Sequence, residues 1–349
     1  MSLTDPEAID LLAAMLRASS PCGEEDRVAG VILGAMSSAG FDVRRDEAGN
    51  AIGTIGNAGR TLMFLGHMDT APGVVTVEQR QGKLFGRGAV DAKGPLAAAI
   101  VAASRADASV KLVIVGAVQE EGPSAGARHL AKTDPPDLLI IGEPSNWDAV
   151  TLGYKGNQRF NIIFSRNSAH TASPEDTAPE RAVAFWQRLS DWCREQTSHA
   201  QREFDRLTPT LIGMDSHDDG LCTTAALHVG LRLPPSIDLT TACEGVWALV
   251  GDEPGVEIHF APGEAAVRVE RRGPLVSAFL RGIRAEGGEP RFKVKTGTSD
   301  WNLVAEHWRC PAVAYGPGDS RLDHTPDEHI VLDEYLRGIR VLARVFEGV

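Results

Sequence analysis

Residues 61–70 read TLMFLGHMDT, an apolar run that passes directly into a glycine, a histidine and an aspartate. A short apolar run bounded by turn residues predicts a buried strand. Two later segments have the same form, because residues 111–122 read KLVIVGAVQEEG and residues 137–145 read DLLIIGEPS. Each segment places a histidine or a carboxylate just beyond the end of its strand, and in open α/β sheets ligands bind at that edge.

The segments around these strands extend the pattern. The Ala-rich stretch Gly94–Ala106 predicts a helix, and strands that alternate with helices indicate a parallel sheet covered on both faces. Near the C-terminus a strand at Ala312–Tyr315 runs into a Gly/Pro loop that ends at His324. Helices are expected over Pro274–Glu286 and Leu332–Phe346. Both ends of the chain therefore belong to α/β structure.

The middle of the chain has a different character. Its expected elements are one alternating strand, one long helix and two further strands: Arg159–Ser165, Ala178–Gln196, Ala225–Leu233 and Val256–Phe260. We therefore expect a catalytic α/β domain formed by residues 1–155 and 267–349. An α+β domain of residues 156–266, acting as a lid or a dimerisation domain, interrupts it.

Composition excludes some classes of function. The chain has 349 residues, with 35 Lys and Arg against 47 Asp and Glu. A net charge of −12 disfavours nucleic-acid binding, which depends on basic side chains against phosphate. The five cysteines are scattered, as is typical of reduced thiols in the cytoplasm. No signal-peptide pattern is present, and no apolar run approaches the roughly 18 residues of a membrane span, so we expect a cytoplasmic protein.

The side chains that follow the strands indicate a metal site. So many carboxylates at one sheet edge would repel one another, or would have to bind protons, unless cations balance their charge. Nitrogen and oxygen ligands suit zinc, although cobalt and manganese accept the same ligands. We expect two divalent cations per chain, held by a histidine and a carboxylate each, with one aspartate between them: His67 with Glu143, Glu121 with His324, and Asp91 as the bridge.

Two neighbouring carboxylates have other expected roles. Glu120 precedes a ligand and can take a proton from an activated water and pass it to a leaving amine. Asp69 lies two residues after His67 and can accept the second ring N–H of that histidine, which fixes the tautomer. The sequence therefore predicts Glu120 as the catalytic base and Asp69 as the helper that orients His67.

These motifs resemble the zinc aminoacylase and carboxypeptidase family, which includes acetylornithine deacetylase and succinyl-diaminopimelate desuccinylase. The matching motifs are His-x-Asp after a strand, an Asp-x-Lys-Gly loop, a Glu-Glu pair, Gly-Glu-Pro-Ser and a late histidine, in family order along almost the whole chain. The resemblance implies a zinc-peptidase-like α/β catalytic domain with a parallel-rich sheet, interrupted by an α+β lid. It also implies the same ligands, base and helper.

Three more segments fit the resemblance. Residues 167–174, NSAHTASP, are similar to the family's lid-domain histidine segment, which implies that His170 stabilises an oxyanion from across a dimer. Arg232 resembles the lid arginine that grips a substrate carboxylate, although Gly230 stands where the family usually has an aspartate. Gly297, Thr298 and Ser299 resemble a substrate-binding turn whose backbone amides can hold a carboxylate.

Within the family, residues 143–156, EPSNWDAVTLGYKG, most resemble hydrolases that release lysine or ornithine from the glutamyl side chain of an acidic amino-group carrier protein. The substrate is then either this carrier or a small N-acylated diamino acid. An acetylornithine or acetyl-lysine deacetylase, or a dipeptidase-like enzyme, is an alternative. A metal-binding protein without catalysis is an alternative of another class. We expect a homodimer, with no nucleic-acid or membrane partner.

Simpler interpretations of the same residues remain open. Glu120 and Glu121 could begin a helix, since carboxylates favour helix N-termini, and Asp91 could cap the Ala-rich helix. His170 could be an ordinary loop residue, and Arg232 a surface strand residue. If a carrier docks, it requires a local basic surface, for which the candidates are Lys155, Arg159, Arg268, Arg271 and Arg272.

Overall fold

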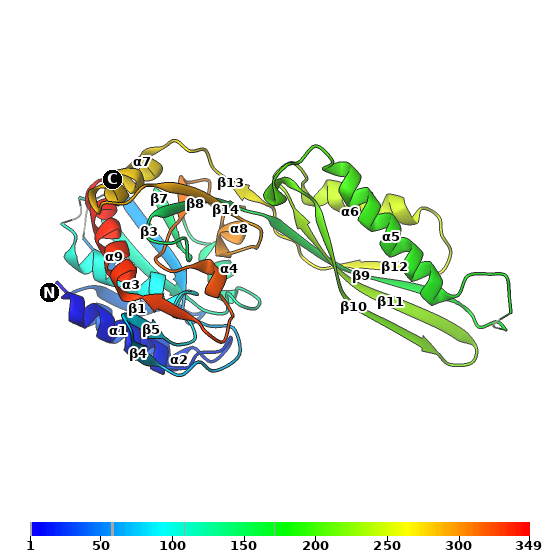
Figure 1. Cartoon of the computed structure of the whole chain (residues 1–349), viewed down its shortest axis with the longest axis horizontal. Coiled ribbons are helices and arrows are strands. Elements are labelled where there is room, and N and C mark those ends of the chain that lie inside the picture. The colour runs from blue at the N-terminus through cyan, green and yellow to red at the C-terminus, as the bar shows by residue number, and fades with distance from the viewer. Residues whose placement is uncertain (1, 57–58, 108, 171) are drawn as a thin grey trace. The chain divides into compact units, whose positions relative to one another are not determined.

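The structure is a computed structural model that describes residues 2–56, 59–107, 109–170 and 172–349. The chain forms two compact units (Figure 1). The first unit comprises Met1–Gly153, Val269–Val294 and Leu303–Val349, and the second comprises Tyr154–Arg268 and Lys295–Asn302. The chain therefore leaves the first unit twice, since residues 154–268 form most of the second unit and residues 295–302 add a short segment to it. The role of the second unit as a lid or dimerisation domain stays a prediction.

A mixed sheet forms the centre of the first unit. Its strands lie in the order β1 (Asp42–Arg45), β2 (Ala51–Ile55), β6 (Lys111–Ala117), β3 (Thr61–His67), β7 (Leu138–Gly142), β15 (Ala312–Ala314) and β8 (Ala149–Tyr154), and β14 (Arg291–Lys295) also pairs with β8. The four central strands β6, β3, β7 and β15 run parallel. The parallel-rich sheet is confirmed, and the antiparallel strands on either side of it were not predicted.

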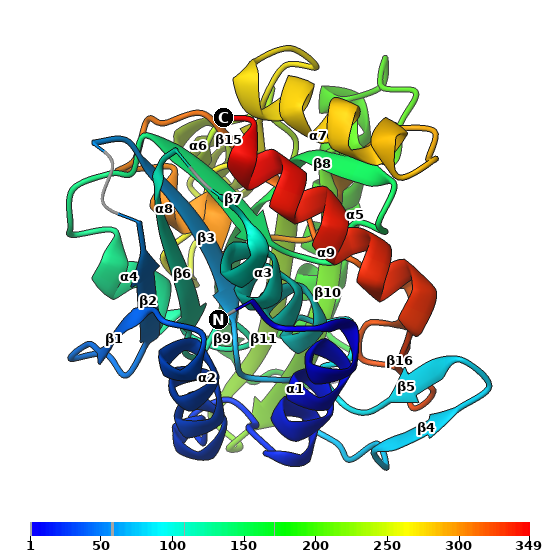
Figure 2. The same cartoon turned by 90° about the vertical axis from the view of Figure 1, so that its left-hand side faces the viewer.

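Helices cover this sheet, and Figure 2 shows α1, α3 and α9 in front of it. The helices of the first unit are α1 (Asp5–Arg17), α2 (Asp26–Ser38), α3 (Lys93–Arg105), α4 (Ala125–Leu130), α7 (Pro274–Ala285) and α9 (Leu332–Glu347). Every residue of α3 from Lys93 to Ala103 is buried. Its alanines are small enough to let the helix pack closely against α1, α9 and β3, so α3 lies at the centre of the core.

Short elements complete the first unit and its connections. A small sheet has the order β16 (His329–Val331), β5 (Lys83–Phe85) and β4 (Glu78–Arg80). A single 3₁₀ turn, η2, covers Ser320–Leu322, and β13 (Val267–Arg268) and α8 (Asp300–Val304) lie where the chain passes between the units. The small sheet pairs β16, just after His324, with β5, just before the loop that contains Asp91.

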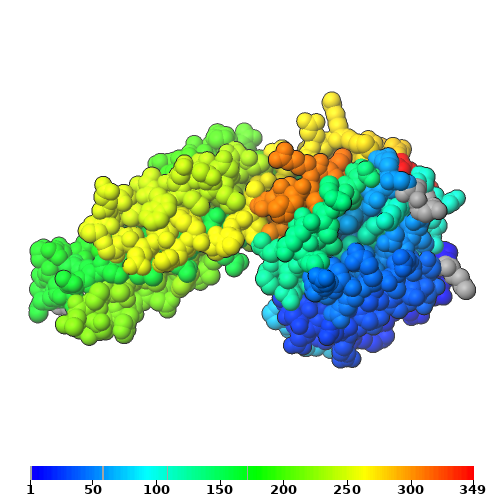
Figure 3. All heavy atoms as spheres, turned by 180° about the vertical axis from the view of Figure 1, so that it is seen from behind, coloured from blue at the N-terminus to red at the C-terminus, as the bar shows by residue number. Residues whose placement is uncertain are grey.

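The second unit is an antiparallel sheet with two helices. Its strands have the order β10 (Thr208–Asp218), β11 (Cys222–Leu233), β9 (Gly156–Asn167) and β12 (Val256–Phe260). The helices are α5 (Ala178–Gln196) and α6 (Leu239–Val250), and η1 is a short turn at Glu203–Asp205. Figure 3 shows the part of this unit around α6 and β12, in yellow, on the face seen from behind.

A separate apolar core stabilises the second unit. Alternate residues of β9 are buried, including Phe160 and Phe164, and they pack with Phe185 of α5 and Val246 of α6. The helix α5 has its predicted bounds, and at its start Thr177 forms a capping box with Glu180. In the part of the chain that the structure describes, no helix is long and apolar enough to cross a membrane.

Candidate metal centre

The end of β3 places His67. The strands β6, β3 and β7 align Gly116, Gly66 and Gly142 side by side, so the residues that follow them leave the sheet together. A Cβ on Gly142 would lie 2.4 Å from the Phe64 ring and 3.0 Å from the Gly66 Cα. A larger residue at Gly142 would collide with Phe64 and with the backbone of β3, so this glycine lets the ends of β3 and β7 lie close together.

Asp69 fixes the orientation of His67. The Asp69 side chain is fully buried, and its two carboxylate oxygens accept backbone N–H groups from Glu120 at 3.1 Å and Glu121 at 3.0 Å. The His67 Nδ1 lies 3.1 Å from the Asp69 carbonyl oxygen and 3.3 Å from its carboxylate. Burial alone would raise the pKa of the Asp69 carboxyl, but the contacts with His67 and with the two amides lower it below its usual value. Asp69 therefore holds both His67 and the Glu120–Glu121 turn.

We expect Asp69→Asn to weaken metal binding by roughly 10–100-fold, because the substitution puts a neutral amide in place of the carboxylate that orients the predicted ligand His67. The new NH2 group would also face a backbone N–H, which costs about 1–3 kcal/mol of stability. Metal titration and chemical unfolding of metal-free protein measure the two effects. The matched control is Asp46→Asn, since Asp46 also accepts backbone amides, from Ala48, Gly49 and Asn50. An equal loss of metal affinity in both variants would contradict this role of Asp69.

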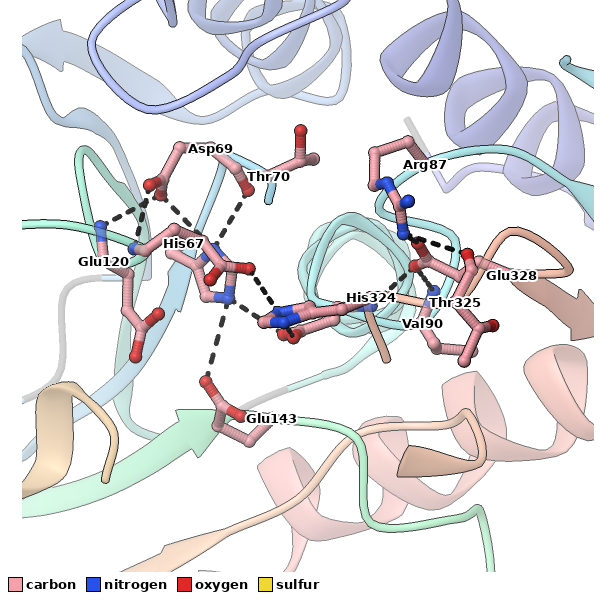
Figure 4. A network of polar contacts seen from close by, with 12 residues as sticks. His67, Asp69, Thr70, Arg87, Val90, Glu120, Glu143, His324, Thr325 and Glu328 are labelled. Atoms are coloured by element: carbon pink, nitrogen blue, oxygen red, sulfur yellow. Dashed lines mark hydrogen bonds and ion pairs between the residues drawn. The ribbon is translucent and has the colours of Figure 1, made fainter. Parts of the chain in front are cut away.

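The other ring nitrogen of His67 points toward two carboxylates (Figure 4). Its Nε2 lies 3.1 Å from the Asp91 Oδ1 and 3.8 Å from the Glu143 Oε1. Burial disfavours a charged imidazole, but hydrogen bonds to Asp69 and Asp91 raise the pKa of His67 well above its usual value. His67 thus lies between carboxylates on both sides, and their negative charge favours a cation at this position.

A second group lies beside the first. The His324 Nε2 is 2.9 Å from the Glu121 Oε1 and 3.2 Å from the Asp91 Oδ2. The hydrogen bond to Asp91, with the charges of Glu121 and Asp91, raises the pKa of His324 to about 9. Burial and the neighbouring Asp91 raise the pKa of the Glu121 carboxyl. The two oxygens of Asp91 thus face different histidines.

The donor set fits two divalent cations. Ligand atoms of His67, Asp91 and Glu143 lie within 4.8 Å of one another, and so do those of Asp91, Glu121 and His324. Each group offers one imidazole nitrogen and two carboxylates, which are ligands that zinc accepts. The structure therefore brings all five predicted ligands together, with Asp91 common to both groups. Their role as ligands is taken up as a proposal below.

Glu120 lies at the edge of the two groups. Its backbone N–H is bonded to Asp69, while its side chain is turned away from Asp69 (Figure 4). The carboxylate is half-buried, and its charge contributes to raising the pKa of His67. The preceding residue, Gln119, has a φ of 63°, which is unusual for a non-glycine residue and turns the chain sharply at this point. The helix interpretation of Glu120 and Glu121 is wrong, because both residues lie in this turn.

The remaining predicted residues lie in the second unit. His170 is exposed, and its Nδ1 accepts the N–H of Ala172 at 3.1 Å. Arg232 is partly buried, and its Nη1 donates to the Thr298 Oγ1 at 3.3 Å. Residues 297–299 connect β14 to α8, and the Ser299 N–H donates to the Asn302 Oδ1 at 2.9 Å. The Ser299 amide is therefore already bonded within the turn.

Contacts of Asn302 and Lys155 in the second unit were not found from the sequence. Asn302 also donates to the carbonyls of Lys155, just before β9, and Ala265, just before β13, so it ties residues 297–302 to both segments. Lys155 was a candidate for docking, but it is only 1% exposed, and its amine donates to the carbonyls of Glu203 and Arg206. That interpretation of Lys155 is wrong, since a buried lysine that satisfies carbonyls cannot meet a partner.

Comparison with known proteins shows which proteins the chain resembles over its whole length. The model of Peptidase family M20/M25/M40 matches residues 63–348. A LysW-lysine hydrolase from Deinococcus radiodurans is 42% identical over 345 residues, covering 96% of this chain and 95% of its own. A LysW-lysine/LysW-ornithine hydrolase from Sulfurisphaera tokodaii is 29% identical over 328 residues, covering 93% and 90%.

Solved structures share the fold at low sequence identity. The aminopeptidase PepT from Bacillus cereus has a TM-score of 0.78 at 16% identity and covers 100% of this chain and 99% of its own. A dinuclear metal binding peptidase from Bacillus subtilis has a TM-score of 0.72 at 11% identity and covers 98% and 97%.

Proposed function

The chain belongs to Peptidase family M20/M25/M40 and is a metal-dependent hydrolase of amide bonds, and we propose that it releases lysine or ornithine from an acidic carrier protein in the cytoplasm, in amino-acid biosynthesis. The family predicted from the motifs is confirmed. The observation that carries the proposal is the 42% identity to a LysW-lysine hydrolase over nearly the full length of both chains. A match of this length includes the segments that carry the proposed ligands and the proposed base, as well as the rest of the fold.

The metal centre is proposed to hold two cations, with zinc as the first candidate. His67 and Glu143 would hold one, Glu121 and His324 the other, and Asp91 would serve both. The closeness of the two ligand groups and their mixed nitrogen and oxygen donors support this assignment. When bound, the cations supply Lewis-acid activation of water and polarisation of the substrate carbonyl.

The chain's own residues are proposed to move the protons. Glu120 takes a proton from the attacking water as the water oxygen bonds to the acyl carbon. Glu120 then donates this proton to the amide nitrogen as the carbon–nitrogen bond breaks, which gives a carboxylic acid and an amine. The remaining proton of the water passes from the acid to the amine, so that the products are a carboxylate and an ammonium group. Asp69 keeps His67 in one tautomer and holds the turn before Glu120, through contacts of 3.0–3.3 Å.

The second unit is proposed to bind substrate and to form a homodimer. Arg232 would hold a substrate carboxylate, together with the turn of Gly297, Thr298 and Ser299, and His170 would stabilise the oxyanion. Burial and the neighbouring Arg159 lower the pKa of the Arg232 guanidinium, which indicates a cation poorly compensated by its surroundings. The edge strand β10 exposes Ile212 at 57% and Met214 at 42%, which suits pairing with a second copy.

The alternatives within the family differ in the acyl group. An acetylornithine or acetyl-lysine deacetylase would act on the small substrate alone, and a dipeptidase-like enzyme would prefer a dipeptide. The non-catalytic alternative requires the loss of the base, whereas Glu120 is present beside the centre. The exposed Arg159 and Arg268 remain candidates for docking an acidic carrier, although Arg268 already pairs with Asp205 at 3.4 Å.

Metal content and hydrolysis test the proposal together. We expect about two cations per chain by elemental analysis. Carrier-linked lysine should be hydrolysed faster than N-acetyl-lysine, activity should be lost on chelation, and zinc or cobalt should restore it. If N-acetyl-lysine or a dipeptide is the best substrate, the proposed carrier-linked substrate is wrong and one of the alternatives within the family is correct. Folded protein without metal and without hydrolysis of any of these substrates would contradict the central claim.

A further inference from the structure

Glu328 is a buried carboxylate close to the metal centre that the mechanism above does not use. It lies four residues after His324, in the segment Thr325-Pro326-Asp327-Glu328, and it is 1% exposed. A carboxylate removed from water is strongly destabilising unless charges and hydrogen bonds compensate it. The position of Glu328 therefore requires partners, and the structure supplies them for both of its oxygens.

Each oxygen of Glu328 has a defined partner (Figure 4). The Oε2 accepts from the Arg87 Nη1 at 2.8 Å. The Oε1 accepts the backbone N–H of Val90 at 3.0 Å and that of Asp91 at 3.3 Å. Glu328 thus holds the backbone at Asp91, the residue whose two side-chain oxygens face the two histidines, although 237 residues separate Glu328 from Asp91.

Arg87 joins the same two segments from the other side. Its side chain is 13% exposed, and its Nη1 also donates to the carbonyl of Thr325 at 3.1 Å. The carbonyl of Glu328 accepts the N–H of Gly86 at 3.2 Å. These contacts tie the loop that contains Asp91 to the loop that contains His324. We call the pair of Arg87 and Glu328 the loop clamp.

His324 needs an external restraint of this kind. Its φ is 61°, a left-handed conformation that a non-glycine residue adopts at an energetic cost and that persists only where the surroundings impose it. Its side chain is 55% exposed, so packing alone does not fix the ring. The next residue, Thr325, is held by Arg87 and by its own bonds to Leu322. The loop clamp therefore acts directly beside the strained residue.

We propose that Arg87 and Glu328 are positioning residues that hold Asp91 and His324 at the spacing required by one of the two cation positions, an inference that rests on the proposed two-metal function. The clamp contacts the loops of Asp91 and His324, whereas His67 is the last residue of β3 and Glu143 directly follows β7. Loss of the clamp should therefore weaken the two cation positions unequally. The position shared by Asp91, Glu121 and His324 is the one affected more.

The test is cobalt or zinc titration of metal-free Glu328→Gln, followed by calorimetry. In the variant an amide NH2 must face either Arg87 or the two backbone N–H groups, so the clamp loses one of its two sides. We expect one of two binding steps to weaken by roughly 10–100-fold, as for other partners that orient metal ligands, and the other step to change little. Arg87→Gln should give the same unequal effect from the opposite side of the clamp.

Glu286→Gln is the matched control. Glu286 is also a carboxylate of the first unit that two arginines hold, since Arg340 and Arg344 donate to it at 2.6 Å and 3.0 Å. This control should lose stability and keep both binding steps. Unfolding curves of the metal-free proteins separate the two effects, and the double variant of Arg87 and Glu328 should lose less affinity than the sum of the single variants.

The possible outcomes separate the two proposals. Unequal weakening in both clamp variants, with the control unchanged, supports the clamp. If folded Glu328→Gln and Arg87→Gln both bind cations in two steps with wild-type affinities, the clamp proposal is overturned and the two-metal function is left intact. Equal weakening of both steps in the clamp variants and in Glu286→Gln would also overturn it, because a general loss of stability would then explain the result. A wild-type chain that binds no cation would overturn both proposals.

Discussion

Glu120→Gln is expected to lower kcat by roughly 10²–10⁴-fold while the protein keeps both cations, because the amide cannot accept or return a proton. The backbone of Glu120 is held by its N–H bond to Asp69, and this bond does not depend on the side chain. The substitution changes no proposed ligand, so metal content should be preserved. Steady-state kinetics and elemental analysis on the same preparation measure both quantities.

Glu121→Gln is the control for this prediction, since it makes the same chemical change one residue further along. The Glu121 carboxylate lies 2.9 Å from His324 and belongs to a ligand group, so its loss should lower metal content. The two variants should therefore differ in metal content although both lose activity. Substantial turnover in Glu120→Gln, with two cations bound, would reject Glu120 as the base.

The second large effect is expected for Asp91→Asn. Each oxygen of Asp91 faces a different histidine, at 3.1 Å for His67 and 3.2 Å for His324. An asparagine offers one oxygen and one NH2, and the NH2 cannot ligate a cation or balance its charge. We expect the loss of one cation per chain and a fall in kcat/KM of at least about 100-fold, the upper end of the cost of losing an outer partner of a ligand.

Asp327→Asn is the control for Asp91→Asn. Asp327 is an exposed carboxylate in the segment after His324, so its replacement removes a negative charge close to the centre in the sequence without removing a proposed ligand. Metal titration and kcat/KM should both remain near the wild-type values. Two tightly bound cations in Asp91→Asn would reject the assignment of Asp91 to both positions.

The metal centre could be predicted from the sequence because its chemistry is local. His67 ends one apolar strand, Glu143 directly follows another, and Glu121 follows a third after a sharp turn. Parallel strands end at a common edge. The order of the motifs also identified the family, which the matches confirm. Neither source of information requires knowledge of contacts between distant residues.

Two elements of the second unit were not predicted. The strand β10 has mostly exposed residues and no regular burial, so it lacks the alternation that identifies a half-buried strand. Its pairing with β11 decides its structure. The helix α6 does carry local signals, since it begins at a capping Asp238 and buries Ala242, Val246 and Val250 at helical spacing.

Individual side chains show the same division. Lys155 reads as a basic surface residue, yet tertiary contacts bury it. Glu328 reads as one of several acidic residues after His324, and only the folded chain brings it to Arg87 and Asp91. Ser299 was predicted to offer an amide to substrate, whereas the fold bonds that amide to Asn302.

The sequence alone determined the fold class, the family, the proposed ligands and the proposed base, because these follow from residue types at the ends of apolar strands. The tertiary structure decided which buried charges hold the centre in place, which surfaces remain exposed and which backbone amides are already bonded. The physical reason is that a buried charge or amide is stable only beside its partner, and the partner of Glu328, Arg87, lies 241 residues away along this chain.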